Sequence, residues 1–134
     1  MSTGLPDLPG LDAHLDRCVA LAAGALEAGD EPFGSVLVDA DGTALAEDRN
    51  WISSGDAIRH PEFELARWAA EHVEPDRRAR CTVVTSGEHC PMCSAAHARV
   101  GLGAIVYAHS SAQLVGWLTE FGAAPSPVTR LHGA

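Results

Sequence analysis

The chain has 134 residues, a length typical of one domain rather than two. It carries 18 acidic and 9 basic residues, every basic residue is arginine, and the formal charge is −9. The absence of lysine excludes Schiff-base chemistry, a pyridoxal phosphate anchor and the lysine of a phosphate-binding loop. The acidic balance opposes binding to a phosphate backbone, so we expect no nucleic-acid partner.

The sequence also predicts where the protein works. No apolar run approaches the roughly 18 to 20 residues of a membrane span, and residues 1–10 lack the basic and apolar regions of a secretory signal. We therefore expect a cytoplasmic protein without a membrane segment. In a reducing compartment, closely spaced cysteines favour metal or redox chemistry, as at Cys90 and Cys93. The other two, Cys18 and Cys81, lie in apolar segments and are expected to be buried packing residues.

In the first half of the chain, apolar residues at helical spacing predict a helix from Leu11 to about Leu26, with Gly29 as its stop. The segments 33–39 and 43–50 flank Asp41-Gly42, a pair that favours a tight primed turn. These two segments therefore predict a β-hairpin.

In the second half, helices are expected over 61–73 and 91–100, because each begins with a proline and is followed by a breaker. Two short β-branched runs, 81–86 and 104–108, predict buried strands. A last amphipathic helix is expected over about 112–121. The arginines at 77, 78 and 80 are interpreted as part of a solvated loop.

This order of elements predicts an α/β fold: a three-layer α/β/α sandwich with a mixed central sheet of about five strands. We expect one domain over residues 1–134, with irregular tails at 1–10 and 123–134.

Two clusters carry the chemistry, His60-Pro61-Glu62 and Cys90-Pro91-Met92-Cys93. In each, a possible metal ligand precedes a proline at the start of a helix, so His60 and Cys90 should occupy the two helix N-caps. Cys93 returns to the same side one turn after Cys90, which is the spacing that two ligands of one ion need. One imidazole and two thiolates predict a single Zn²⁺ ion, and three protein ligands leave a fourth position open, as in catalytic zinc sites.

Glu62 is the acid beside this predicted ion. It lies two residues after His60, and regular helical spacing would separate the two side chains. If they converge, Glu62 can take a proton from a zinc-activated water, deliver it to a ring nitrogen and later protonate a departing amine.

These motifs resemble the cytidine deaminase superfamily, which comprises zinc-dependent nucleobase and nucleoside deaminases. The resemblance runs from about Leu11 to Trp117 and includes Glu31-Pro32-Phe33-Gly34, Asn50, the two clusters and Thr85 to Cys93. The nearest members are guanine deaminase, yeast-type cytosine deaminase and tRNA adenosine deaminase. The resemblance implies zinc on His60, Cys90 and Cys93, and Glu62 as the proton shuttle.

The resemblance also implies a substrate pocket and a homodimer whose partner contributes to that pocket. Asn50 would hydrogen bond the ring, Phe33 would stack near it, and the main chain around Thr85 to Glu88, including Ser86, would line the pocket. His89 stands where the family usually has proline, and it could be a pocket residue, a rival ligand or a neutral substitution. A pocket or surface role is favoured because a residue adjacent to Cys90 should point away from the ion. Trp117 is a candidate to close over a flat ring, although packing explains it equally well.

The expected reaction is hydrolytic deamination of a small nucleobase or nucleoside, with guanine-like rings slightly ahead of cytosine-like ones. A tRNA-specific adenosine deaminase is the alternative. Two further interpretations rank lower: a dithiol redox protein using Cys90 and Cys93, and a structural zinc module with His89 or His97 as a fourth ligand.

Overall fold

A computed structural model describes residues 7–120 and 122 of the chain. In chain order the elements are α1 (Leu11–Glu27), β1 (Gly34–Val38), β2 (Ala44–Arg49), the 3-10 turn η1 (Ile52–Ser54), α2 (Pro61–His72), α3 (Pro75–Arg78), β3 (Thr82–Gly87), α4 (Pro91–Val100), β4 (Ile105–His109) and α5 (Ser111–Glu120). All the predicted helices and strands are present. The expectations for residues 1–6, for Phe121 and for the tail 123–134 lie outside the described residues.

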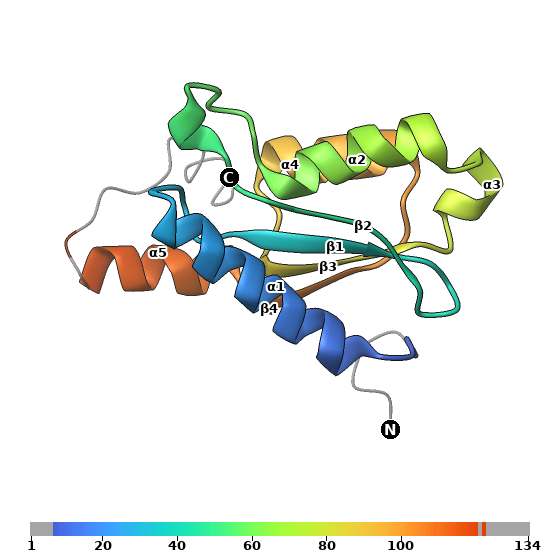
Figure 1. Ribbon diagram of the computed structural model, residues 1–134, viewed down its shortest axis with the longest axis horizontal. Helices are drawn as coiled ribbons and strands as arrows, with labels where there is room; N and C mark the ends of the chain where they lie inside the picture. Colours follow the sequence, from blue (N-terminus) through green and yellow to red (C-terminus); the bar gives the residue numbers. More distant parts are fainter. Residues whose placement is uncertain (1–6, 121, 123–134) are drawn as a thin grey trace.

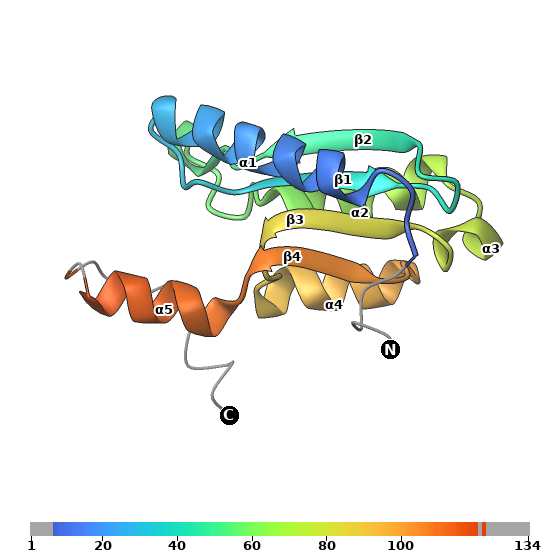
Figure 2. The ribbon, with the colours of Figure 1, turned by 90° about the horizontal axis from the view of Figure 1, so that it is seen from below.

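The sheet is mixed, with strand order β2-β1-β3-β4. Strand β1 pairs antiparallel with β2 and with β3, whereas β3 and β4 are parallel and joined through α4. The described residues thus form four strands, and the expected number of about five was slightly too high. Helix α1 covers one face and helices α2 and α4 cover the other, which gives the predicted three layers (Figures 1 and 2).

The two faces of the sheet hold separate apolar cores because side chains alternate along each strand. Under α1, Cys18 packs with Val36 and Val84. On the opposite face, Leu37 and Val83 pack against residues of α2 such as Leu65. Odd-numbered positions of β1 and β3 therefore face α2 and α4, which decides on which side Ser35 and Thr85 lie.

The connection between β1 and β2 differs from the tight two-residue turn that Asp41-Gly42 predicts. Residues 39–43 separate the strands, the Gly42 N–H donates to the Asp39 carbonyl, and the ladder shifts register between Leu37 and Val38. Gly42 has a φ of 90° and lies against Pro9, where a Cβ would come 2.6 Å from the Pro9 carbonyl oxygen. A longer turn that packs against Pro9 therefore forms in place of the predicted two-residue primed turn.

The arginines interpreted as a solvated loop are mostly structural. Residues Pro75–Arg78 form the short helix α3. The Arg77 guanidinium pairs with Asp39 in the β1–β2 turn. Arg78 donates hydrogen bonds to the carbonyls of Ala70 (2.9 Å) and Val73 (2.8 Å), near the C-terminus of α2. No helix among the described residues is both long and apolar enough to cross a membrane.

The strand directions bring the ends of several strands together along one edge of the sheet, the edge that runs across the strands. This edge holds the start of β1 and the ends of β2, β3 and β4. Helices α2 and α4 begin after His60 and Cys90 and also have their N-termini near this edge (Figure 1). Every residue predicted for the site except Trp117 lies at one of these element ends.

Candidate metal centre and catalytic site

The two ligand clusters fold as the sequence predicts. His60 and Cys90 are the N-cap residues of α2 and α4, with extended φ/ψ angles of −86°/137° and −70°/169°. Pro61 and Pro91 follow at the first helical positions, where the missing N–H costs no hydrogen bond. Each proline keeps the preceding residue out of the helix, so its side chain can turn toward the other cluster.

His60, Cys90 and Cys93 meet at the N-termini of α2 and α4. The two sulfurs are 3.5 Å apart, and each lies 3.7 Å from the His60 Nδ1 atom. Tetrahedral zinc with sulfur ligands at about 2.3 Å and nitrogen at about 2.0 Å places its ligand atoms about 3.5 to 3.8 Å apart. The three side chains therefore fit zinc in both chemistry and spacing.

The electrostatics of the cluster favour a bound cation. Hydrogen bonding with Cys93, and then with His60, lowers the pKa of the Cys90 thiol to about 4. The hydrogen bond with Cys90 and burial raise the pKa of Cys93. The hydrogen bond with Cys90 also raises the pKa of His60. A metal ion binds the deprotonated forms of all three side chains and would replace these protons.

Glu62 converges with this cluster, as the sequence interpretation requires. Its carboxylate is 5% exposed, and the Oε2 atom lies 3.8 Å from the Cys93 sulfur. The Oε1 atom accepts hydrogen bonds from the hydroxyls of Thr85 (2.9 Å) and Ser35 (3.3 Å). Burial raises the pKa of Glu62, which favours a group that takes up and releases a proton.

Sequence reasoning missed Ser35 altogether, and it placed Thr85 at the pocket only through its main chain, not through its hydroxyl. Both are fully buried, and their hydroxyls are 2.7 Å apart because the two residues are paired across β1 and β3. The available signal was the presence of a small polar residue in each of two otherwise apolar strands. Only the strand register reveals that the two hydroxyls meet.

Asn50 follows β2 at the same sheet edge and is 1% exposed. Its Oδ1 atom accepts a hydrogen bond from the Ile52 N–H at 3.1 Å, which fixes the orientation of the amide. The Nδ2 atom is buried and has no hydrogen-bond partner among the described residues. This nitrogen is a donor that a bound ring could use.

Phe33 lies next to Asn50, whose N–H donates to the Phe33 carbonyl. The Phe33 ring is 6.2 Å from the His109 imidazole, and Trp117 of α5 contacts His109 edge-on at 5.3 Å. Gly87 lies beneath the first two rings: a Cβ there would come within 2.7 Å of His109 and 2.9 Å of Phe33. Phe33 and Trp117 thus both lie beside the His109 ring.

The three remaining predicted residues are Ser86, Glu88 and His89. The Ser86 Oγ atom accepts a hydrogen bond from the Gly34 N–H, and the Glu88 N–H donates to the His109 carbonyl. His89 is 2% exposed, which excludes a surface role, and packs edge-on against His97. Neither histidine belongs to the three-ligand cluster, the only such group among the described residues.

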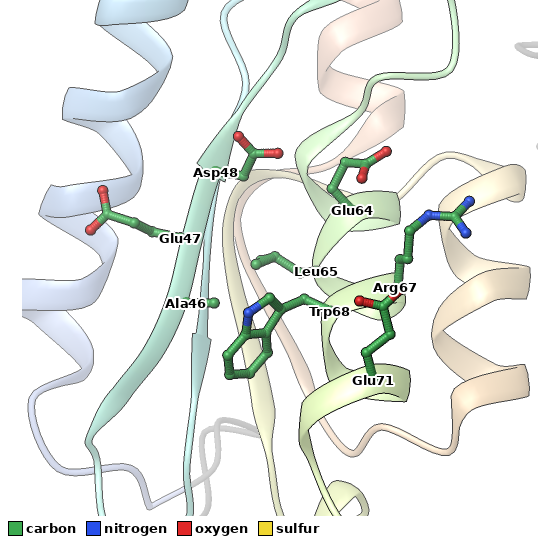
Figure 3. Close-up of a pocket in the computed structure, with 8 residues that line it drawn as sticks. All are labelled: Ala46, Glu47, Asp48, Glu64, Leu65, Arg67, Trp68 and Glu71. Carbon is green, nitrogen blue, oxygen red and sulfur yellow. The ribbon is translucent and has the colours of Figure 1, made fainter.

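A separate hollow of about 220 Å³ lies between β2 and α2 (Figure 3). In this view the Asp48 and Glu64 carboxylates lie at the upper end of the hollow and the Trp68 ring lies below them, whereas Glu47 points toward α1, where it pairs with Arg17. None of the residues predicted for metal or substrate binding lines this hollow. It is therefore distinct from the candidate site.

Comparisons with known proteins agree with the geometry. Residues 11–109 match the family described as the cytidine and deoxycytidylate deaminase zinc-binding region. Bacillus subtilis guanine deaminase is 36% identical over 103 residues, covering 75% of this chain and 60% of that protein. A probable cytosine deaminase of Schizosaccharomyces pombe is 28% identical over 115 residues, 84% of this chain and 68% of its own length. A tRNA(Ile)-lysidine synthase of Deinococcus radiodurans is 37% identical over 107 residues, which are 79% of this chain but only 18% of that protein.

Solved structures show the same fold. The Bacillus subtilis guanine deaminase structure has a TM-score of 0.69 at 32% identity and covers 79% of this chain and 68% of its own. A structure from a study of tRNA:A34 deaminases has a TM-score of 0.66 at 26% identity, and the match covers 74% of this chain and 76% of the other. The family match spans both ligand clusters and Glu62. The chain therefore belongs to the cytidine and deoxycytidylate deaminase zinc-binding family.

Proposed function

We propose that the protein deaminates a small free nucleobase or nucleoside, with guanine-like rings ahead of cytosine-like ones. The observation that carries this proposal is the position of Glu62, whose Oε2 atom lies 3.8 Å from Cys93 within the three-ligand cluster. An acid beside three zinc ligands supports hydrolysis rather than a purely structural metal site.

The residues divide the reaction as follows. His60, Cys90 and Cys93 would hold the zinc ion, which when bound would make a water acidic enough to lose a proton near pH 7. Glu62 accepts that proton and passes it to a ring nitrogen of the substrate. It then takes the second proton from the oxygen now bonded to the ring carbon and delivers it to the amino group, so the C–N bond breaks, ammonia leaves and the carbon keeps that oxygen as a carbonyl.

Asn50 supports a planar, polar substrate. Its Nδ2 donor is buried without a partner among the described residues, and an unsatisfied donor costs about 1 to 3 kcal/mol. A ring carbonyl or an unprotonated ring nitrogen would satisfy it. Phe33 offers the neighbouring aromatic surface, and a flat heterocycle with an acceptor on its edge fits both residues. Ser86, Glu88, His89 and Trp117 stay as predicted pocket residues.

An ammonia-release screen tests the proposal. Zinc-loaded protein is assayed with guanine, cytosine, adenine, their nucleosides and triazine analogues, and guanine is expected to give the fastest release. Glu62→Gln should reduce release at least about 100-fold, the usual scale of general acid–base catalysis, with zinc still at one ion per chain. Glu64→Gln, two residues further along α2 and paired with Arg59, is the matched control and should keep normal turnover.

Deamination of adenosine in tRNA is the second candidate. The likeness to the structure from the tRNA:A34 deaminase study favours it. The charge of −9 and the absence of lysine oppose it, because a polymer substrate needs cationic contacts to its phosphates. Turnover of an anticodon stem-loop with all free bases and nucleosides inert would reverse our order of the two candidates.

We further propose a homodimer formed through the outer face of α2 and α4. A groove of about 470 Å³ runs between these helices, lined by apolar side chains including Phe63, Met92 and Val100. Arg67, Glu71 and Arg99 lie on the same groove, so a two-fold axis can bring opposite charges together. Light scattering should give a mass of twice 14.0 kDa, and a monomer at micromolar concentration would contradict this proposal.

A cytoplasmic location is part of the same proposal. All four cysteines are free, and Cys90 and Cys93 must stay reduced to bind zinc. Fractionation of cells that make the untagged protein would test it.

A further inference from the structure

We infer that the Ser35 and Thr85 hydroxyls are positioning residues for Glu62: they hold its Oε1 atom and leave Oε2 as the oxygen that exchanges protons. The inference deepens the proposed deamination and rests on it for its kinetic consequences. It assigns a role to two buried side chains that neither ligand cluster contains.

The three groups come from three different elements. Ser35 and Thr85 are directly paired across β1 and β3 and share the sheet face that α2 covers. Glu62 is the second residue of α2, which Pro61 starts at the same sheet edge. The strand register and the helix start together bring two hydroxyls to one carboxylate oxygen.

Counting protons gives the direction of the hydrogen bonds. Each hydroxyl carries one hydrogen. If Ser35 donates to Thr85 over 2.7 Å, the Thr85 hydrogen is available for Glu62 Oε1 at 2.9 Å. The other acceptor within reach of Thr85, the Gly34 carbonyl, is farther away at 3.3 Å. The shorter contacts therefore form a chain from Ser35 through Thr85 to Glu62, in which each bond polarises the next.

This chain makes the two oxygens of Glu62 unequal. Oε1 accepts the Thr85 hydrogen, with the Ser35 hydroxyl behind it in the chain, whereas Oε2 faces the ligand cluster at 3.8 Å from Cys93. A carboxylate that is 5% exposed has little water to replace a lost donor. Without Thr85, Glu62 would lose both a donor and its fixed orientation, and misplaced catalytic groups lower the rate of the chemical step.

The test compares Thr85→Val with Thr85→Ser, using guanine or the base that the screen selects. Thr85→Val keeps the shape of the side chain but removes the hydroxyl, so we expect kcat to fall about tenfold or more with KM changed less than about threefold. Thr85→Ser restores the donor and should recover most of kcat. Thr82→Val, on the same strand and also buried, is the matched control and should keep normal kcat.

Two further measurements separate positioning from a general structural defect. Zinc should stay at one ion per chain in all three variants, and the solvent deuterium isotope effect on kcat should rise only in Thr85→Val, because proton transfer becomes slower there. In a crystal structure of zinc-loaded Thr85→Val, the Glu62 carboxylate should be rotated while His60, Cys90 and Cys93 keep their positions. Ser35→Ala, expected to lower kcat less, repeats the test if Thr85→Val does not fold.

Normal kcat in Thr85→Val, equal losses in Thr82→Val, or no recovery in Thr85→Ser would overturn the inference. An unmoved Glu62 in the crystal structure would do the same. If the wild-type protein releases no ammonia from any compound, the proposed function fails, and the crystal comparison still decides whether the hydroxyls position Glu62.

Discussion

Gly87 has no side chain, and the Phe33 and His109 rings of the candidate pocket occupy the space that a side chain would take. It is paired with His109 across β3 and β4 and lies two residues beyond Thr85, on the same sheet face. The space above it is taken by the edges of Phe33 and His109. Gly87 therefore lies on the same strand as Thr85, which donates to Glu62, and directly against the rings of the predicted ring-binding surface.

Substituting this glycine should damage substrate binding. In Gly87→Ala the added Cβ meets His109 and Phe33 at under 3 Å, so both rings must move. We expect KM to rise more than kcat falls, and unfolding in urea to show a loss of about 1 to 3 kcal/mol, the usual cost of overpacking. Gly24→Ala in α1, where nothing lies within 4 Å of the new Cβ, is the control. It should be neutral or stabilising by up to about 1 kcal/mol, and unchanged KM and stability in Gly87→Ala would show that the rings adapt freely.

At the scale of elements, periodicity predicted the helices and strands because each buries one apolar side against the sheet. The positions of the prolines predicted the ligand cluster, because proline determines where α2 and α4 begin and therefore where His60 and Cys90 lie. Neither pattern could predict the Ser35–Thr85 pair, which depends on strand register, or the 39–43 turn, which depends on contact with Pro9. Interactions between distant segments are the part that local sequence patterns do not contain.

One such interaction joins the loop after α1 to the loop that carries Asn50. The Asp30 carboxylate, 2% exposed at its side chain, accepts hydrogen bonds from the Arg49 guanidinium at 2.8 Å and from the Ser53 N–H at 2.7 Å. Hydrogen bonding to Ser53, and then to Arg49, lowers the pKa of Asp30. A carboxylate whose pKa is lower in the folded state stabilises the fold above its unfolded pKa, and this contribution is lost as the pH falls through the folded value.

Asp30→Asn should therefore be less stable than the wild type near pH 7. The difference in Tm between the two should shrink as the pH is lowered below about 4, where the wild-type carboxyl also becomes protonated. Thermal unfolding followed by circular dichroism from pH 7 to pH 3 measures it. Asp16→Asn, on the exposed side of α1, should not change Tm at any pH. A constant difference between Asp30→Asn and the wild type would mean that the charge of Asp30 is not what joins the loops.

At the scale of the whole molecule, the metal centre joins parts that the sheet alone does not hold together. His60 begins α2 and Cys90 and Cys93 begin α4, and these two helices form one complete layer of the fold (Figure 1). Bound zinc would tie their N-termini to each other beside Glu62. Stability and catalysis are then linked through one ion, because the ligands that prepare the site also fix the helix layer.

Zinc removal should consequently lower the stability of the entire domain. A ligand that binds only the folded state adds about 2.7 kcal/mol at a free concentration of 100 times its Kd, which corresponds to about 10 °C in Tm for a domain of this size. Chelation should lower the Tm of the wild type by about this amount, and added zinc should restore it. Glu62→Gln should respond in the same way, because it keeps all three ligands. Cys93→Ala should show no response to zinc, and comparing each variant with and without the ion cancels the packing lost with the buried sulfur. A full zinc-dependent rise in the Tm of Cys93→Ala would show that the ion binds without this thiolate, and would remove it from the ligand set.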